Sequence, residues 1–134
     1  MYFIFKNLMD KTIAFFCLLF LSPILALTGI LLYLLYGNPI IFTQTRLGKN
    51  KKVFKIYKFR SMKLTQSDKY NEFPDPERLT AFYKFIRRFK IDELPQLFNI
   101  LIGNMSFVGP RPWMPQAIEK FSIKDENRFS VKPG

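Results

Sequence analysis

The sequence predicts a helix-dominated α+β protein with an amino-terminal membrane helix, a small β-hairpin and amphipathic helices at the membrane surface. Three observations support this fold class. Residues 13–36 are 24 residues without a charge, and Leu and Phe predominate among them. Two short stretches of β-branched and aromatic residues follow, on either side of a Gly-Lys-Asn turn. Beyond residue 79, apolar side chains recur with helical spacing.

The uncharged run would form a helix of about 36 Å, which exceeds the roughly 30 Å hydrocarbon core of a bilayer. Ser22 and Pro23 interrupt it in the middle. Proline lacks a backbone donor, so one carbonyl in lipid needs another partner, and the Ser22 hydroxyl can supply it. Residues 44–63 hold eight Lys and Arg and no acid, which predicts a cytoplasmic flank. The residues alone leave two shapes open, a kinked spanning helix and a re-entrant helix.

The chain after this run begins with two predicted strands, Ile40–Thr45 and Val53–Phe59, joined by a turn at residues 48–50. Residues 64–76 read as a polar loop. A helix follows, and its apolar stripe consists of Leu79, Phe82, Tyr83, Ile86 and Phe89. This stripe fits either packing against a core or a position in the headgroup plane.

A second helix is predicted to begin at Asp92, which is a good N-cap, with Glu93 and Pro95 in the first turn. Its apolar face consists of Leu94, Leu97, Phe98 and Leu101, and Gly103 ends it. Residues 105–115 form a Gly/Pro-rich loop that holds Arg111 between two prolines. A mixed-charge helix is expected from about Pro115 to Glu126.

The composition excludes several classes of protein. A chain with 49% hydrophobic residues and a net charge of +11 is not a disordered tail. The single cysteine, Cys17, excludes a disulfide scaffold within the chain. The absence of His excludes His-based metal sites and a Ser-His-Asp triad. Acid–base chemistry then falls to carboxylates, Lys or Tyr.

The adjacent acids Asp92 and Glu93 are the first candidates for chemistry. In the plainer interpretation they only cap a helix. Carboxylates also bind Mg²⁺ beside phosphate oxygens, and a carboxylate can attack phosphorus. The many cations nearby are expected to keep Asp92 ionised.

Three cations are candidates for binding phosphate. Lys58 and Arg60 alternate with apolar residues at a strand end, and partly buried cations need anions. Arg111 presents a fork-shaped donor from a stiff loop. The plainer interpretations are a solvated cytoplasmic flank and a cap on backbone carbonyls.

Three segments together resemble the motif series of the bacterial sugar transferases, the monotopic phosphoglycosyl transferases. They are Lys58-Phe59-Arg60-Ser61-Met62, Asp92-Glu93-Leu94-Pro95-Gln96-Leu97 and Met105-Ser106-Phe107-Val108-Gly109-Pro110-Arg111-Pro112. Residues 44–48 and the Ser22-Pro23 break also resemble the family pattern, so the resemblance covers nearly the whole chain.

The resemblance implies a reaction in which a phosphosugar passes from a UDP-sugar to a polyprenyl phosphate, usually undecaprenyl phosphate, with release of UMP. Such enzymes use Mg²⁺ and begin the assembly of capsule, O-antigen, exopolysaccharide or glycoprotein glycans. By the same resemblance Asp92 is the nucleophile and forms a covalent phosphosugar intermediate. Glu93 assists it, and both acids are the metal ligands.

The resemblance further assigns Lys58, Arg60, Arg87 and Arg111 to substrate phosphates. It makes the Ser22-Pro23 break a re-entrant turn, so that residues 1–38 form a re-entrant membrane helix and residues 39–134 a catalytic domain. The expected location is the cytoplasmic face of the bacterial inner membrane. The expected partners are UDP-sugar, undecaprenyl phosphate and membrane lipid, without nucleic acid, and a homodimer stays open.

The chain resembles the minimal kind of this family, without extra amino-terminal spanning helices, and is expected to stop inside the family's domain at its C-terminus. A rival hypothesis is a membrane-anchored basic module that binds anionic lipid or nucleic acid without catalysis. It explains the charge and the anchor, but it gives Asp92, Glu93 and Arg111 no task.

Overall fold

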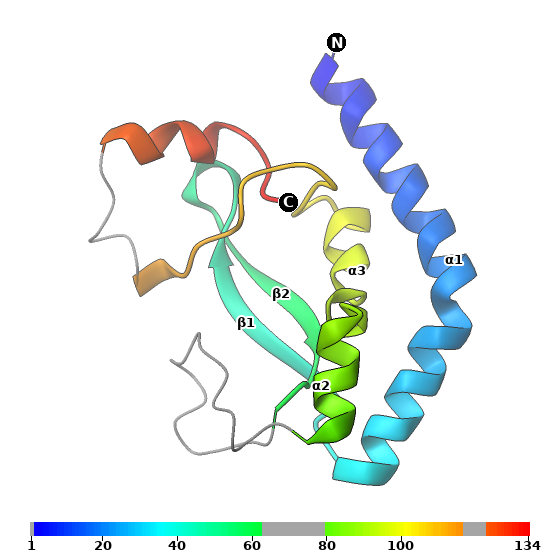
Figure 1. Ribbon diagram of the computed structural model, residues 1–134. Coiled ribbons are helices and arrows are strands. Elements are labelled where there is room, and N and C mark those ends of the chain that lie inside the picture. Colours follow the sequence, from blue (N-terminus) through cyan, green and yellow to red (C-terminus); the bar gives the residue numbers. More distant parts are fainter. Residues whose placement is uncertain (1, 63–79, 117–122) are drawn as a thin grey trace.

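The computed structural model describes residues 2–62, 80–116 and 123–134. In chain order its elements are α1 (Tyr2–Tyr36), β1 (Ile41–Leu47), η1 (Lys49–Lys51), β2 (Val53–Phe59), α2 (Ala81–Arg88), η3 (Ile91–Glu93), α3 (Gln96–Leu101) and η5 (Ile123–Ser130), where η denotes a 3-10 helix. Figure 1 shows α2 and α3 between the hairpin on one side and α1 on the other. This arrangement confirms the predicted helix-dominated α+β class.

Helix α1 is continuous, and Figure 1 shows it bent near its middle, where Pro23 lies inside the helix. Pro23 cannot donate to the carbonyl of Leu19, four residues earlier. The Ser22 hydroxyl donates to that carbonyl instead, at 2.8 Å, which confirms the prediction for Ser22. Residues 3–36 are long and apolar enough to cross a membrane, and most of their large apolar side chains are exposed. The re-entrant course stays a prediction.

The hairpin is antiparallel, with Ile41 opposite Phe59 and Leu47 opposite Val53. Strand β1 runs two residues beyond its predicted end, because Leu47 is buried and its N–H donates to the carbonyl of Trp113 at 2.8 Å. The turn contains Asn50 at φ 55°, a left-handed conformation that Asn tolerates better than most residues. The hairpin and its turn are therefore confirmed.

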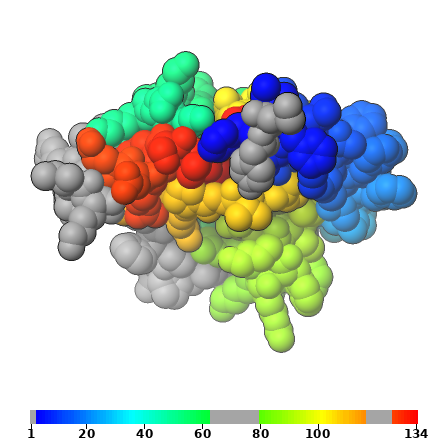
Figure 2. Space-filling model, turned by 90° about the horizontal axis from the view of Figure 1, so that it is seen from above, coloured from blue at the N-terminus to red at the C-terminus, as the bar shows by residue number. Residues whose placement is uncertain are grey.

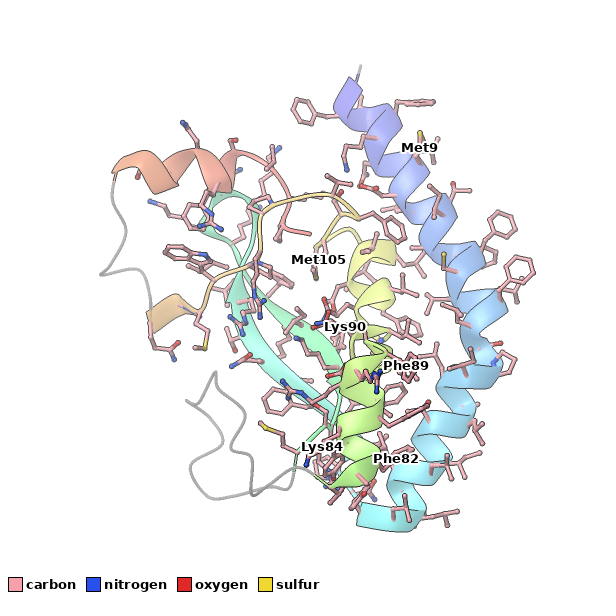
Figure 3. The ribbon with its side chains drawn as sticks, in the orientation of Figure 1. Met9, Phe82, Lys84, Phe89, Lys90 and Met105 are labelled. Atoms are coloured by element: carbon pink, nitrogen blue, oxygen red, sulfur yellow. The ribbon has the colours of Figure 1, made fainter. Side chains whose placement is uncertain are left out.

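The buried apolar side chains form two clusters that attach α1 to the rest of the chain. The first consists of Ala14, Phe54, Ile56, Ile100 and Met105, and Met105 is labelled in Figure 3. The second consists of Leu32, Phe59, Tyr83 and Ile86. Each half of α1 thus packs against the hairpin through a different helix, α3 in the first cluster and α2 in the second.

Helix α2 has Thr80 as its N-cap, and the Thr80 hydroxyl accepts from the N–H of Tyr83 at 3.3 Å. Of the predicted apolar stripe, Tyr83 and Ile86 are buried, as core packing requires, whereas Phe89 is 60% exposed. Phe89 does not share this buried face, because α2 ends at Arg88 and Phe89 is its C-cap. Leu79, the first residue of the predicted stripe, lies outside the described residues. Phe89 pairs instead with the exposed Phe85, with ring centroids 4.9 Å apart. The helix therefore has a buried face and a separate exposed apolar edge.

Two other predicted segments lie partly or wholly outside the described residues. The polar loop at residues 64–76 lies entirely outside them. Of the helix expected from about Pro115 to Glu126, the described C-terminal part is not α-helical but belongs to η5.

Candidate active site

The acid dyad, Asp92 and Glu93, lies in the short turn η3 between α2 and α3. Lys90 precedes it in a left-handed conformation, with φ 58° and ψ 19°, and so ends α2 and redirects the chain. The expectation that Asp92 caps a helix is wrong. Helix α3 begins at Gln96 after Pro95, and no side chain within the described ranges caps it, while the Asp92 side chain turns inward and is only 7% exposed.

Burial determines the electrostatics of Asp92. Its Oδ1 atom is buried and has no hydrogen-bond partner among the described residues. Burial, and then the charge of Glu93, raise the pKa of Asp92, while the Ser61 hydroxyl, Arg87 and Lys58 act in the opposite direction with smaller effect. Desolvation thus penalises the charged carboxylate more than the nearby cations favour it, and the expectation that those cations keep Asp92 ionised stays a prediction.

Glu93 and Lys58 connect the dyad to the hairpin. Lys58 Nζ lies 3.2 Å from Glu93 Oε1, and the Lys58 side chain is only 23% exposed. Both residues line a cleft of about 250 Å³. The remaining residues that line it are Arg46, Ile56, Gln96, Gly109, Arg111, Pro112 and Gly134. Of the residues predicted from the sequence, the cleft therefore brings together Lys58, Glu93 and Arg111.

Arg111 lies on the exposed rim of this cleft, in a loop that the last residues of the chain support. Ser106 N–H donates to the carbonyl of Pro133 at 2.8 Å, and Gly134 N–H donates to that of Pro110 at 3.1 Å. A Cβ atom on Gly109 would lie 2.2 Å from the carbonyl oxygen of Lys132. Only glycine permits this close backbone approach, which fixes the loop before Arg111.

The structure does not bring Arg60 into the cleft. Arg60 is 5% exposed, and its guanidinium donates to the carbonyl of Tyr36, the last residue of α1, at 2.7 Å and to that of Gly37, the next residue, at 3.2 Å. This contact satisfies carbonyls that a helix end leaves without partners. Arg87 lies on α2 and acts on Asp92 through its charge. Ser22 and Pro23 lie in the middle of α1 and do not line the cleft.

Sequence reasoning missed two contributors to the site. Arg46 is buried at 7% exposure, and it donates to the carbonyl of Pro112 at 3.3 Å and to Gln44 Oε1 at 2.6 Å. Arg46 lies one residue beyond the predicted end of the first strand, and its only signal was its place in the basic stretch of residues 44–63. Ser61 follows β2, and its hydroxyl lowers the pKa of Asp92. The residues next to Ser61 in the sequence gave no indication of this role.

The donor set fits a magnesium ion. Mg²⁺ is usually held by one or two carboxylates together with substrate phosphates and waters. Asp92 and Glu93 supply two adjacent carboxylates, and Asp92 Oδ1 is a buried acceptor without a partner within the described chain. No group of three or more acidic or sulfur ligands occurs in the described ranges, so a metal here would need substrate oxygens as well.

Comparison with known proteins identifies relatives of this chain. The family model for "Bacterial sugar transferase" matches residues 1–134. The sugar transferase EpsL of Bacillus subtilis (strain 168) is 43% identical over 131 residues, which are 98% of this chain and 65% of EpsL.

Two longer relatives have names that specify a reaction. The UDP-glucose:undecaprenyl-phosphate glucose-1-phosphate transferase of Escherichia coli (strain K12) is 40% identical over 134 residues, covering 96% of this chain and 29% of that protein. The UDP-N-acetylgalactosamine-undecaprenyl-phosphate N-acetylgalactosaminephosphotransferase of Aeromonas hydrophila is 38% identical over 134 residues, covering 96% and 32%. The chain thus spans only part of each relative.

Proposed function

Because this chain belongs to the bacterial sugar transferase family, we propose that it transfers a phosphosugar from a UDP-sugar to a polyprenyl phosphate and releases UMP. The names of the relatives support undecaprenyl phosphate as the acceptor. They specify glucose in one case and N-acetylgalactosamine in another, so they do not select the sugar. The product would begin the assembly of a surface or protein glycan.

The observation that carries this proposal is the carboxylate of Asp92. It is buried, one of its oxygens has no partner among the described residues, and it adjoins a cation-lined cleft through Glu93. A desolvated carboxylate is a stronger nucleophile than a hydrated one, because water no longer stabilises its charge. A helix-capping role would need no such burial.

The proposed reaction has two displacements at one phosphorus. An Asp92 oxygen attacks the phosphorus that bears the sugar, and the bond from that phosphorus to UMP breaks, so UMP leaves with the electron pair. A phosphate oxygen of the polyprenyl phosphate then attacks the same phosphorus. The bond to Asp92 breaks, and the carboxylate is restored as the polyprenyl-diphosphate sugar forms.

The cations would stabilise charge on the phosphates during both steps. Lys58 and Arg111 line the cleft, and Arg87 lies where its charge reaches Asp92. Arg60 is engaged by the end of α1, so we propose that it acts mainly by holding that helix. Mg²⁺, held by Asp92 and Glu93, would supply further positive charge to the phosphates.

We propose that α1 is re-entrant and holds the site at the cytoplasmic face of the bacterial inner membrane. The bend near Pro23 supports a helix whose two ends reach the same surface (Figure 1). The exposed pair Phe85 and Phe89 would lie at the headgroup level. This depth would bring the phosphate of a long lipid and a water-soluble UDP-sugar to one site.

UMP release tests the reaction. The purified protein in lipid would receive Mg²⁺, undecaprenyl phosphate and a panel of UDP-sugars. We expect UMP with one sugar, no UMP from Asp92→Asn, and unchanged release from Glu126→Gln, a matched change in an exposed acid. Equal release by wild type and Asp92→Asn would disprove the nucleophile. Anionic lipid binding without UMP from any sugar would favour the non-catalytic module.

Cysteine labelling tests the topology. Single cysteines at positions 2 and 50, in a Cys17→Ser background, would be probed from outside intact cells. The re-entrant course predicts protection at both positions. Labelling at position 2 with protection at position 50 would establish a spanning helix instead.

A further inference from the structure

A second cavity lies at the amino-terminal end of α1, on another side of the loop that follows α3. It measures about 530 Å³. Figure 2 shows the face on which the start of α1 (blue), this loop (yellow to orange) and the C-terminal residues (red) meet. The residues that line it are Phe3, Ile4, Lys6, Asn7, Asp10, Lys49, Ser106, Val108, Gly109, Val131 and Lys132.

The cavity combines positive charge with an apolar opening. Three of its lining residues, Lys6, Lys49 and Lys132, are cations, and one, Asp10, is an acid. Three of its four large apolar lining residues are more than half exposed. Phe3, Ile4 and Val108 are 62%, 77% and 76% exposed, respectively.

The single acid does not balance the cations. Asp10 Oδ2 lies 2.9 Å from Lys6 Nζ and is thereby engaged. Lys132 donates to Asn7 Oδ1 at 2.6 Å, a neutral partner. Lys11 adjoins it, since a Cβ on Gly103 would lie 3.4 Å from both Lys11 Cε and Lys132 Nζ.

The cations around Lys132 also affect its pKa. Burial lowers the pKa of Lys132, and the charges of Lys11, Lys49 and Lys6 lower it further, against the opposing effect of Asp10. Like charges held together in this way are relieved by a bound anion.

We propose that this cavity binds the headgroup phosphate of an anionic phospholipid, with the phosphate between Lys6, Lys49 and Lys132 and the acyl chains leaving past Phe3, Ile4 and Val108. The apolar surface of α1 begins at the same end, so the cavity lies where an embedded helix meets the headgroups. Lysines near an anionic leaflet each contribute measurably to lipid binding.

The occupant is a bulk phospholipid rather than the polyprenyl phosphate substrate. The cavity and the catalytic cleft share only Gly109 among their described lining residues, and neither acid of the dyad nor Lys58 or Arg111 lines the cavity. A phosphate held here is therefore not placed on Asp92. The proposal depends on the membrane location proposed above but not on the reaction.

Native mass spectrometry of the protein in mixed micelles tests the site. The probes are phosphatidylglycerol, phosphatidylcholine, undecaprenyl phosphate and inorganic phosphate. We expect wild type to retain phosphatidylglycerol in preference to phosphatidylcholine, and Lys49→Gln/Lys132→Gln to retain it about thirtyfold more weakly. Lys52→Gln is the matched control, because Lys52 is exposed on the same hairpin turn but does not line the cavity.

Four outcomes would contradict the proposed site. Equal retention of the two phospholipids, or equal weakening in Lys52→Gln, would exclude a built site. Binding of inorganic phosphate without lipid preference would indicate a free-anion site, and displacement by equimolar undecaprenyl phosphate would indicate the substrate. Lys49→Arg/Lys132→Arg should restore retention, which separates lost charge from lost folding. UMP release by the same preparations reports on the reaction independently.

Discussion

Asn99 forms a polar contact that joins α3 to the hairpin. It is fully buried, its Oδ1 accepts from the N–H of Tyr57 at 3.0 Å, and its Nδ2 donates to the carbonyl of Lys55 at 2.7 Å. The carbonyl of Lys55 and the N–H of Tyr57 point away from β1. The side-chain amide of Asn99 therefore makes hydrogen bonds to the outer edge of β2, where a third strand would otherwise pair.

Replacing Asn99 by Ala would leave one donor and one acceptor of the β2 backbone without partners. An unsatisfied buried group costs about 1–3 kcal/mol, and the lower part of that range applies because both bonds are partly buried. We therefore expect a loss of about 2–3 kcal/mol in the free energy of unfolding, or about 10 °C in Tm for a chain of this size.

Thermal unfolding in one detergent, followed by circular dichroism, measures this loss. Asn104→Ala is the matched control, because Asn104 is exposed three residues beyond the end of α3. We expect that control to unfold within about 0.5 kcal/mol of wild type. If Asn99→Ala unfolds together with Asn104→Ala, the two hydrogen bonds do not stabilise the junction and the reasoning is wrong.

Three further predictions concern the dyad and the turn before it. Ser61→Ala removes a group that lowers the pKa of Asp92, so the acidic limb of the kcat/KM profile should move to higher pH, whereas Ser130→Ala should leave it in place. Asp92→Asn should raise the free energy of unfolding by about 1 kcal/mol at pH 7, because the folded state disfavours the charged carboxylate there. The gain should vanish below pH 3.8, where the carboxyl is protonated in both the folded and the unfolded state, and denaturant titration at the two pH values measures it. Lys90→Gly should stabilise the protein by about 1 kcal/mol relative to Lys90→Gln, since both variants lose the charge and only glycine relieves the left-handed backbone; equal midpoints in urea would contradict this.

The sequence predicted the features that depend on near neighbours. Pro23 and Ser22 are adjacent, so the loss of one donor and its replacement by another could be worked out from the chain. The hairpin followed from a turn of three residues between two alternating stretches, and its strands were correct to within two residues. Such features need only the local backbone and a side chain within reach.

The predictions that failed depend on contacts between distant parts of the chain. Asp92 has the residue type of an N-cap, but burial of its side chain near Ser61, 31 positions earlier, outweighed the local preference. The position of Arg60 was not predictable, because its partners lie at the end of α1, 23 and 24 residues away.

The end of β2 and the two residues that follow it interact with both α1 and the acid dyad. Lys58 pairs with Glu93, Arg60 binds the last carbonyls of α1, and Ser61 acts on Asp92. Because these residues lie within four positions, the backbone holds them at nearly fixed separations. The position of the dyad relative to the end of α1 is therefore determined by β2, and the charge of the dyad is adjusted by the same few residues. A change at Arg60 should act on the depth of the site, whereas a change at Lys58 acts directly on its charge.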